Sequence, residues 1–191
     1  MTFSLSPVDQ TEHDHDAIEH LLDLAFGLSR LAKTSYQLRL GNTAIPGLSL
    51  VMRDRALGLI GAISFWPVAI GREMTRALLL GPLAVHPERQ NMGVGRALIA
   101  EGLTRARTRE HKLIILVGDP PFYARFDFRQ VPDGQIALPG PVDPKRLMYL
   151  ELAEGALVEA QGLMLPPWRW AELNAPRATT SGWQPEAAPQ G

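Results

Sequence analysis

The sequence contains no cysteine among its 191 residues. This absence excludes a disulfide framework, a cysteine nucleophile and metal sites built from thiolates. Proteins of reducing compartments commonly lack disulfides, and we therefore expect an enzyme or a binding domain of the cytoplasm.

Long apolar runs and blocks of like charge are also missing. No segment reaches the roughly 18 consecutive apolar residues of a membrane-spanning helix, and the N-terminus has no cationic start followed by an apolar stretch. The 19 Lys and Arg residues are interspersed with 20 Asp and Glu residues. A sequence without a basic block predicts neither nucleic acid nor an anionic membrane as a partner.

The composition is that of an ordinary globular protein, with 46% hydrophobic and 20% charged residues. A chain of this length suits one domain with a buried core. We predict a single domain over residues 1–170. The segment 171–191 is rich in Ala and Pro and can bury little, so we expect a poorly ordered tail there.

Hydrophobic periodicity predicts an α/β fold, because apolar spacings of three and four residues alternate with short apolar runs. The strands between 48 and 85 have short links and should be antiparallel. An amphipathic helix at about 95–108 connects the strands at 76–85 and 112–117, which should therefore be parallel. The predicted elements are strands at 3–8, 48–54, 59–70, 76–85, 112–118 and 146–152, and helices at 17–28, 29–39, 95–108 and 120–128.

The segment "RQNMGVGRAL", residues 89–98, places Gly93 and Gly95 at the start of the amphipathic helix. Backbone N–H groups at a helix N-terminus bind anions such as phosphate, and glycines let the anion approach the backbone. Arg96 would add a positive charge. The alternative is that Gly95 and Gly102 only allow close packing of the helix on a sheet.

Two phosphate-binding motifs fit this segment poorly. A nucleoside-triphosphate loop is excluded because no Gly-Lys-Ser/Thr follows the glycines. A dinucleotide fold would use Asp119, which ends the next strand, to hold a ribose. Against it, Leu98 stands where the third glycine belongs, and seven residues including Pro87 separate the strand from the glycines.

"QNMGVG", residues 90–95, matches the Q/R-x-x-G-x-G/A pattern of the GNAT superfamily of acyl-CoA-dependent N-acyltransferases. "LGPLAVHPERQNMGVGRALI" resembles that superfamily's fourth strand and pyrophosphate-binding helix. "ILVGDPPFYARFDF" resembles its next strand and short helix, and "RLMYLELAEGAL" the closing strand of one bacterial branch. The resemblance implies a mixed, mostly antiparallel central sheet with helices on both faces and splayed fourth and fifth strands. It also implies transfer of an acetyl group from acetyl-CoA to a primary amine, without a metal.

The fourth strand of this superfamily binds the pantetheine arm and the acyl carbonyl through its backbone. At the matching place Gly81 and Pro82 interrupt the strand, and this would leave the N–H groups of Leu83 and Val85 unpaired. The alternative is an ordinary β-bulge. The cofactor-binding residues implied by the resemblance are Leu83, Ala84, Val85, Gln90, Asn91, Met92, Gly93, Val94, Gly95 and Arg96.

Tyr123 stands where the superfamily often has a tyrosine that protonates the leaving thiolate. A phenol with a pKa of about 10 suits that role. The alternative is that Tyr123 only packs with the nearby phenylalanines at 122, 126 and 128. Relatives usually have glycine where this chain has Asp127, and aspartate tolerates the left-handed backbone of such a turn better than most residues.

The sequence does not identify a general base, because the strand at 76–85 contains no acid. The candidates are His86, Glu73 and Asp119. We favour structural roles for all three, with His86 and Glu73 as solvated loop residues and Asp119 as a helix cap, so that water would deprotonate the amine.

The acceptor is also unnamed. In this architecture the acceptor pocket is built by the first two helices and later loops, here around residues 26–40 and 130–145. These segments contain neither an aromatic box nor a dense acidic cluster.

Two further segments have plain structural interpretations. His13, His15, Asp16 and His20 suggest a metal site, but acidic residues at a helix start favour its dipole, and we expect a capped, solvated helix start. "LMLPPWRW", residues 163–170, fits a dimer arm, a lid or a cover for the core. We favour a cover or a contact between the subunits of a homodimer.

Two functions of other classes remain as alternatives. One is a catalytically silent acyl-CoA-binding sensor, which would not need Tyr123. The other is a dinucleotide-dependent oxidoreductase, which would need Asp119 to face a ribose. The acetyltransferase interpretation uses more of the sequence than either.

Overall fold

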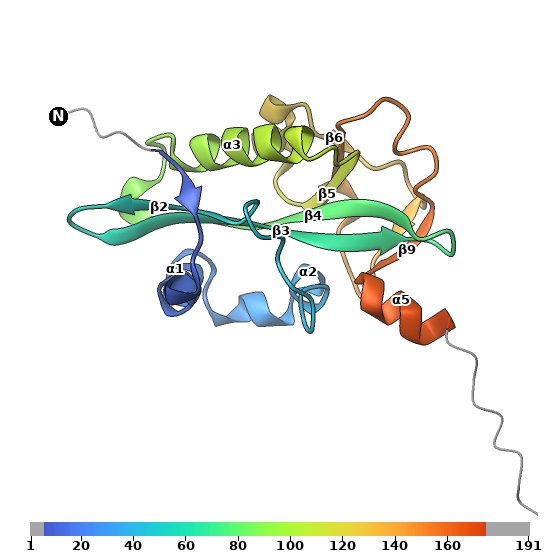
Figure 1. Ribbon diagram of the computed structural model, residues 1–191, viewed down its shortest axis with the longest axis horizontal. Helices are drawn as coiled ribbons and strands as arrows, with labels where there is room; N and C mark the ends of the chain where they lie inside the picture. The colour runs from blue at the N-terminus through green and yellow to red at the C-terminus, as the bar shows by residue number, and fades with distance from the viewer. Residues whose placement is uncertain (1–5, 175–191) are drawn as a thin grey trace, which may run out of the picture.

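A twisted sheet forms the middle layer of the molecule, with α3 on one face and α1 and α2 on the other (Figure 1). The structure is a computed structural model and describes residues 6–174. The strands are β1 (Val8–Asp9), β2 (Leu50–Asp54), β3 (Gly58–Ile70), β4 (Thr75–Val85), β5 (Leu113–Val117), β6 (Arg129–Gln130), β7 (Ile136–Ala137), β8 (Leu147–Glu151) and β9 (Gly162–Leu165). The helices are α1 (His15–Phe26), α2 (Thr34–Gln37), α3 (Val94–Thr108), α4 (Pro120–Tyr123) and α5 (Pro167–Asn174). The 3-10 turns are η1 (Glu12–Asp14), η2 (Leu28–Ala32), η3 (Pro87–Arg89), η4 (Ala124–Phe126) and η5 (Pro144–Arg146).

The strands are ordered β1-β2-β3-β4-β5-β8-β6 across the sheet. Along this path every neighbouring pair is antiparallel except β4 and β5, which pair in parallel. Helix α3 makes the crossover between these two strands, as the strand–helix–strand pattern predicts. The predicted mixed, mostly antiparallel sheet with helices on both faces is confirmed.

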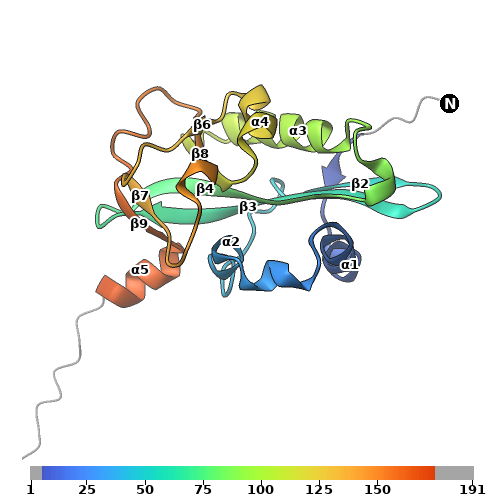
Figure 2. The same cartoon turned by 180° about the vertical axis from the view of Figure 1, so that it is seen from behind.

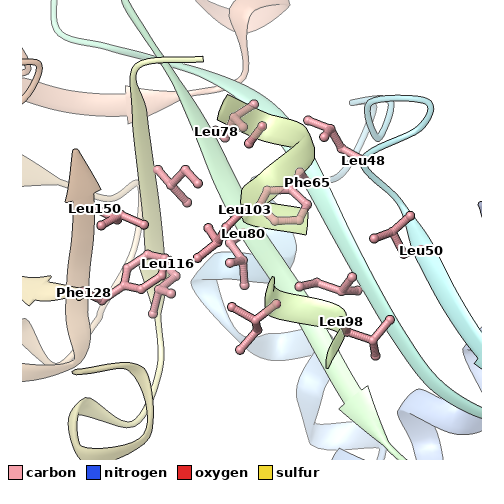
Figure 3. Close-up of a cluster of buried hydrophobic side chains, with 14 of the residues drawn as sticks. Leu48, Leu50, Phe65, Leu78, Leu80, Leu98, Leu103, Leu116, Phe128 and Leu150 are labelled. Carbon is pink, nitrogen blue, oxygen red and sulfur yellow. The ribbon is translucent and has the colours of Figure 1, made fainter. Parts of the chain in front are cut away.

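The core on the α3 face is built around Phe65, Leu98 and Leu103 (Figure 3). All three side chains are buried, and the buried residues of α3 recur at helical spacing, as the predicted stripe requires. A Cβ atom added at Gly102 would lie 2.7 Å from Cε2 of Phe65. Gly102 is therefore a packing glycine, and it lets α3 lie close to β3.

The opposite face of the sheet is covered by α1 and by the turns that follow it (Figure 2). Ile18, Leu21 and Leu22 of α1 pack with Val51 and Ala84 of the sheet. The predicted helix at 29–39 is wrong as a continuous element. It is the turn η2 followed by the four-residue helix α2, because Lys33 between them has an extended backbone.

The C-terminal segment contributes to the sheet in a way that the sequence does not predict. Strand β9 pairs antiparallel with the end of β3 and parallel with β7. In α5, the buried Trp170 donates a hydrogen bond from Nε1 to the carbonyl oxygen of Ala69, at 3.0 Å. Of the interpretations of "LMLPPWRW", the cover for the core therefore holds for Trp170.

Other differences concern the ends of the chain. The first described strand is Val8–Asp9, which overlaps the predicted strand at 3–8 only at Val8, and residues 3–5 lie outside the described part. Helix α5 extends through residue 171, where the predicted tail begins, and residues 175–191 lie outside the described part. No helix within residues 6–174 is both long and apolar enough to cross a membrane.

Candidate active site

Strands β4 and β5 diverge in the middle of the sheet. Their ladder includes only Leu78 and Leu79 of β4, and β5 continues to pair with β8 on its other side. On the β3 side, Gly81 and Pro82 lie between Leu80 and Leu83, where the β3 register advances by two residues instead of three. The predicted interruption is confirmed. The β-bulge and the loss of strand pairing were alternatives in the sequence, and both occur, since β4 bulges against β3 and loses its pairing with β5.

The register also fixes where the backbone N–H groups of β4 point. The N–H of His86 donates to the carbonyl oxygen of Ile60, at 2.8 Å. Hydrogen-bonded and non-hydrogen-bonded pairs alternate along an antiparallel ladder, so Val85 and Leu83 fall on non-hydrogen-bonded positions opposite β3. Their N–H groups therefore point toward the side from which β5 has departed, as the sequence predicts. Ala84 points its side chain into the core.

The glycine loop lies beside this opening. Gly93 precedes α3 with a φ of 84°, and no side chain caps the helix. A Cβ atom added at Gly93 would meet nothing within 4 Å, so the backbone conformation and not crowding requires glycine there. The backbone of the loop is accessible, because the residues from Gln90 to Gly93 and Arg96 are exposed, whereas Val94 is buried.

Gly95 differs from Gly102 in its packing. A Cβ atom added at Gly95 would lie 3.5 Å from Cγ2 of Val85 and 3.8 Å from Cδ2 of Leu83, which are ordinary contact distances. The helix–sheet packing alternative therefore applies to Gly102 and does not require Gly95 to be glycine. The same contacts place the N-terminus of α3 against the part of β4 with the unpaired N–H groups.

A cavity of about 470 Å³ opens where β4 and β5 separate. One wall consists of residues 79–83 of β4, residues 117–119 at the end of β5 and directly after it, and Tyr123. The other wall comes from residues 26–39 around η2 and α2, and from residues 141–146. The first two helical segments and a later loop thus contribute as predicted, although the contribution of the later loop begins at residue 141.

Tyr123 lines the cavity and also packs against other aromatic rings. Its ring makes edge contacts with Phe122 and Phe128, at centroid distances of 5.0 and 5.7 Å. It also lies directly over Gly118, where an added Cβ atom would be 2.2 Å from Cε2 of Tyr123. The two interpretations of Tyr123 are therefore compatible, because aromatic packing holds the ring at the cavity wall.

The environment of Tyr123 keeps its hydroxyl protonated. Burial raises the pKa of Tyr123 to about 12, with Arg146 opposing and Asp119 adding to the shift. At neutral pH the phenol therefore carries its proton. Nearby, Asp127 has a φ of 65°, so this aspartate does adopt the left-handed turn expected of the usual glycine.

The three candidate bases lie in different places. His86 accepts a hydrogen bond at Nδ1 from the N–H of Glu88, at 3.3 Å, and caps the turn η3. Glu73 is exposed on the turn between β3 and β4 and lines a different cavity. Asp119 occupies the N-cap position of α4, as predicted, but its side chain makes no capping hydrogen bond. Asp119 instead lines the cavity next to Tyr123.

The sequence did not identify the basic residues of the cavity, which are Arg30, Lys33, Arg39 and Arg146. Arg30 is 7% exposed and binds Glu19 and Asp23 at 2.6 and 2.9 Å. Arg146 donates from Nε to the carbonyl oxygen of Gly118. Which side chains reach a cavity depends on tertiary contacts, and their spacing in the chain carries no signal of it.

The histidine-rich segment before α1 has a structural role. The carboxylate of Asp14 accepts hydrogen bonds from the backbone and hydroxyl of Thr11, at 2.8 and 3.0 Å, and pairs with Arg53. This arrangement is the capped helix start expected from the sequence. Within residues 6–174, no group of three or more His, Asp or Glu residues is arranged to hold a metal ion.

Comparisons with known proteins agree with this geometry. Residues 47–130 match the family described as "Acetyltransferase (GNAT) domain". The chain is 28% identical over 151 residues to the "Uncharacterized N-acetyltransferase YhbS" of Escherichia coli K12, covering 79% of this chain and 89% of that protein. It is 34% identical over 117 residues to YjhQ, named as another uncharacterized N-acetyltransferase of that strain, covering 60% and 64% of the two chains.

Two solved structures resemble the fold and have bound cofactors. The crystal structure of Escherichia coli YhbS in complex with CoA superposes with a TM-score of 0.73 at 26% identity, covering 87% of this chain and 92% of that one. A GNAT family acetyltransferase from Brucella melitensis in complex with acetyl-CoA has a TM-score of 0.57 at 27% identity, covering 81% and 99%.

Proposed function

We propose that the chain is an acetyltransferase of the GNAT superfamily, which it resembles in sequence and fold, and that it transfers the acetyl group of acetyl-CoA to a primary amine. The observation that carries this proposal is the divergence of β4 and β5 beside the N-terminus of α3. Backbone N–H groups of β4 are left unpaired by this divergence, and Tyr123 lines the resulting opening. The uncapped start of α3 lies next to it. The CoA and acetyl-CoA complexes of the two similar structures support the choice of co-substrate.

The opening supplies two kinds of contact for acetyl-CoA. The backbone of Leu83, Ala84 and Val85 would bind the pantetheine arm and the acyl carbonyl, since the N–H groups of Leu83 and Val85 face away from β3. The N-terminal turn of α3 and the preceding loop would hold the pyrophosphate through backbone N–H groups and the helix dipole. The residues proposed for this second contact are Gln90, Asn91, Met92, Gly93, Val94, Gly95 and Arg96.

Beyond the orientation of the two substrates, the transfer step itself requires one acid. The neutral amine nitrogen of the acceptor attacks the thioester carbonyl carbon, and the resulting oxyanion is stabilised by a β4 N–H group. The carbon–sulfur bond breaks, and Tyr123 donates its proton to the departing thiolate of CoA. Solvent then returns a proton to the tyrosinate, and the amide and CoA leave.

The amine must also lose protons. No acid of β4 lines the cavity, and of the three candidate bases only Asp119 does. We assign to Asp119 the binding of the incoming ammonium group and the passage to solvent of the two protons that the nitrogen loses, one before it attacks and one from the positively charged nitrogen of the tetrahedral intermediate. A second cavity carboxylate, Asp143, is engaged in accepting the backbone N–H of Lys145, at 3.0 Å.

The remaining parts of the interpretation follow from the sequence. We propose that residues 1–170 act as one catalytic domain in the cytoplasm, which fits a chain without cysteine. A homodimer stays a prediction that analytical ultracentrifugation of the purified protein would test.

Calorimetric titration with acetyl-CoA, with NADH as a parallel control, tests the proposed co-substrate. We expect binding of acetyl-CoA and no response to NADH, whereas binding of NADH alone would favour the oxidoreductase. Turnover is then followed as CoA thiol released with a library of amines. The protein contains no cysteine and adds no thiol background to this assay. Binding of acetyl-CoA without thiol release from any amine would favour the silent sensor.

A further inference from the structure

Two arginines that line the cavity, Arg39 and Arg146, form no ion pair within residues 6–174. Arg30 and Arg39 both line the cavity, and both guanidinium groups lie over the ring of Tyr36, at 5.7 and 4.5 Å from its centroid. Arg30 is held by Glu19 and Asp23. None of the ion pairs formed within residues 6–174 includes Arg39.

Aromatic rings hold Arg39 close to the point where β4 is interrupted. Its guanidinium lies 5.9 Å from the ring centroid of Trp66 in β3. The Nε1 of Trp66 donates a hydrogen bond to the carbonyl oxygen of Gly81, at 2.6 Å. One indole ring therefore separates the Arg39 guanidinium from the backbone of β4 at the opening. Stacking on Tyr36 and Trp66 restricts the orientation of the guanidinium plane before a ligand arrives.

The charge on Arg39 is costly where it lies. Burial lowers the pKa of Arg39 to about 10, so the guanidinium is partly desolvated yet remains protonated at neutral pH. A partly desolvated cation without a carboxylate partner is unfavourable, and an anionic ligand would relieve that cost. A carboxylate suits the planar fork of a guanidinium, because it can accept two parallel hydrogen bonds.

The other cations of the cavity are less available for this role. Arg30 is already neutralised, and Nε of Arg146 is engaged by the Gly118 carbonyl. Lys33 is exposed and lies over the ring of Phe26, at 5.5 Å from its centroid. At the opposite wall, the cavity presents Asp119 beside Tyr123. The phenol thus has both a carboxylate, Asp119, and a cation, Arg146, near it, whereas Arg39 lines the wall formed by η2 and α2.

Building on the proposed acetyltransferase function, we propose that the acceptor is an amino carboxylate. Its amine faces Asp119 and Tyr123, and its carboxylate binds the guanidinium of Arg39. An acceptor of this class complements the charges of Asp119 and Arg39, whereas a polyamine would place a second cation next to Arg39.

The test compares matched amines that differ only in whether the carboxylate is free or amidated. Suitable pairs are glycine and glycinamide, 4-aminobutyrate and 4-aminobutanamide, and L-phenylalanine and L-phenylalaninamide. An α-carboxamide lowers the pKa of the neighbouring amine. A larger fraction of the amide compound is therefore unprotonated and able to attack at neutral pH. Preference for the free acid in the α-amino pairs therefore opposes this chemical bias. Thiol release gives kcat/KM for each compound, and calorimetry on the CoA-loaded protein gives its Kd.

We expect the wild-type protein to prefer the carboxylate of at least one pair by about tenfold or more. Arg39→Gln should abolish the preference, and Arg39→Lys should keep part of it because lysine retains the charge but lacks the fork. Neither variant should change the Kd for acetyl-CoA. Arg107→Gln, which removes an exposed arginine of α3, is the matched charge control and should leave the preference intact.

Three results would overturn the proposal. The first is equal or better turnover and binding of the amides in every pair, and the second is a carboxylate preference that survives in Arg39→Gln. The third is clear preference for O-phosphoethanolamine over β-alanine, which would assign the subsite to phosphate. If Arg39→Gln fails to fold by circular dichroism, Arg39→Lys provides the comparison.

The outcome also separates this proposal from the proposed function. If acetyl-CoA does not bind, the acetyltransferase function fails, and the pairs are then titrated onto the free protein. Carboxylate binding that depends on Arg39 would still support the anion subsite, and its absence would remove the subsite as well. If acetyl-CoA binds and amines are acetylated without regard to the carboxylate, only the acceptor class is wrong.

Discussion

The two sides of the cavity are built from different kinds of structure. The proposed cofactor side consists of β4 from Leu80 onward and the N-terminus of α3, which lies against β4 next to the cavity; both are long regular elements joined by one short loop. The proposed acceptor side consists of the neighbouring η2 and four-residue α2, together with residues 141–146, which are far from them in the chain. Continuous elements fix a backbone geometry that many ligands of one kind can share, whereas short turns let individual side chains define one ligand.

The largest effect is expected where the two sides meet, at Tyr123. Tyr123→Phe keeps the ring contacts with Phe122 and Phe128 but removes the proton donor. We expect kcat to fall by about 100-fold or more, and the Kd for acetyl-CoA to stay unchanged. Steady-state kinetics and calorimetry measure both quantities. Unchanged kcat would remove the acid role, and a matching loss of affinity would show that the phenol serves binding.

The pKa of Tyr123 adds a pH dependence to this prediction. Burial raises that pKa to about 12, and an acid is protonated below its pKa. Rising pH should therefore not reduce kcat through Tyr123 until the solution is strongly alkaline. We expect kcat of the wild-type protein to rise or stay level up to about pH 10, as the amine loses its proton. A Tyr123-dependent decrease near pH 8 would contradict this environment for the phenol.

A pair of glycine variants tests whether Gly95 serves cofactor binding while Gly102 serves packing. Gly102→Ala places a methyl group 2.7 Å from the ring of Phe65, and we expect the free energy of unfolding to fall by about 1–3 kcal/mol. Gly95→Ala meets only ordinary contacts at 3.5 Å or more, so stability should be kept while the Kd for acetyl-CoA rises. Denaturant unfolding measures the stability of both variants, and calorimetry measures their Kd for acetyl-CoA. If both variants lost the same stability, Gly95 would be a packing glycine like Gly102.

The glycine loop provides a charge test on the same side. Gly93→Asp adds a negative charge next to the proposed pyrophosphate, and Gly93→Asn is the neutral control of similar shape, since both residues tolerate a left-handed backbone. We expect Gly93→Asp to raise the Kd for acetyl-CoA about tenfold over the control, corresponding to about 1.4 kcal/mol. If the two variants bind equally well, the loop does not hold phosphate.

The smallest effect is expected at the start of α1, away from the cavity walls. Burial alone would raise the pKa of Asp14, but hydrogen bonds from Thr11 and Arg53 outweigh it and lower the pKa. This contribution to stability is therefore present above pH 4 and is lost as the pH falls further. Asp14→Asn should lower the free energy of unfolding at pH 7 by about 1 kcal/mol and reduce its acid sensitivity. Unchanged acid sensitivity in this variant would contradict the capping role, and the Kd for acetyl-CoA should not change.

The same difference between the two sides explains what could be predicted from the sequence. The bulge at Gly81 and Pro82 and the left-handed turn at Asp127 follow from local residue chemistry, so both were predictable. The parallel pairing of β4 and β5 follows from the crossover rule. The break at Lys33 and the pairing of β9 with β3 depend on contacts between distant segments. For the same reason Arg39 gave no signal, since Tyr36 is close to it in the chain but Trp66 comes from β3.

Strand β3 connects the two sides through neighbouring residues. Phe65 packs under α3, and the next residue, Trp66, contacts Arg39 and the Gly81 carbonyl on the acceptor side. Strand β3 also pairs with β2, β4 and β9. Its central amides should therefore exchange with deuterium only through the rarest openings of the molecule, and any such opening breaks both binding surfaces at once.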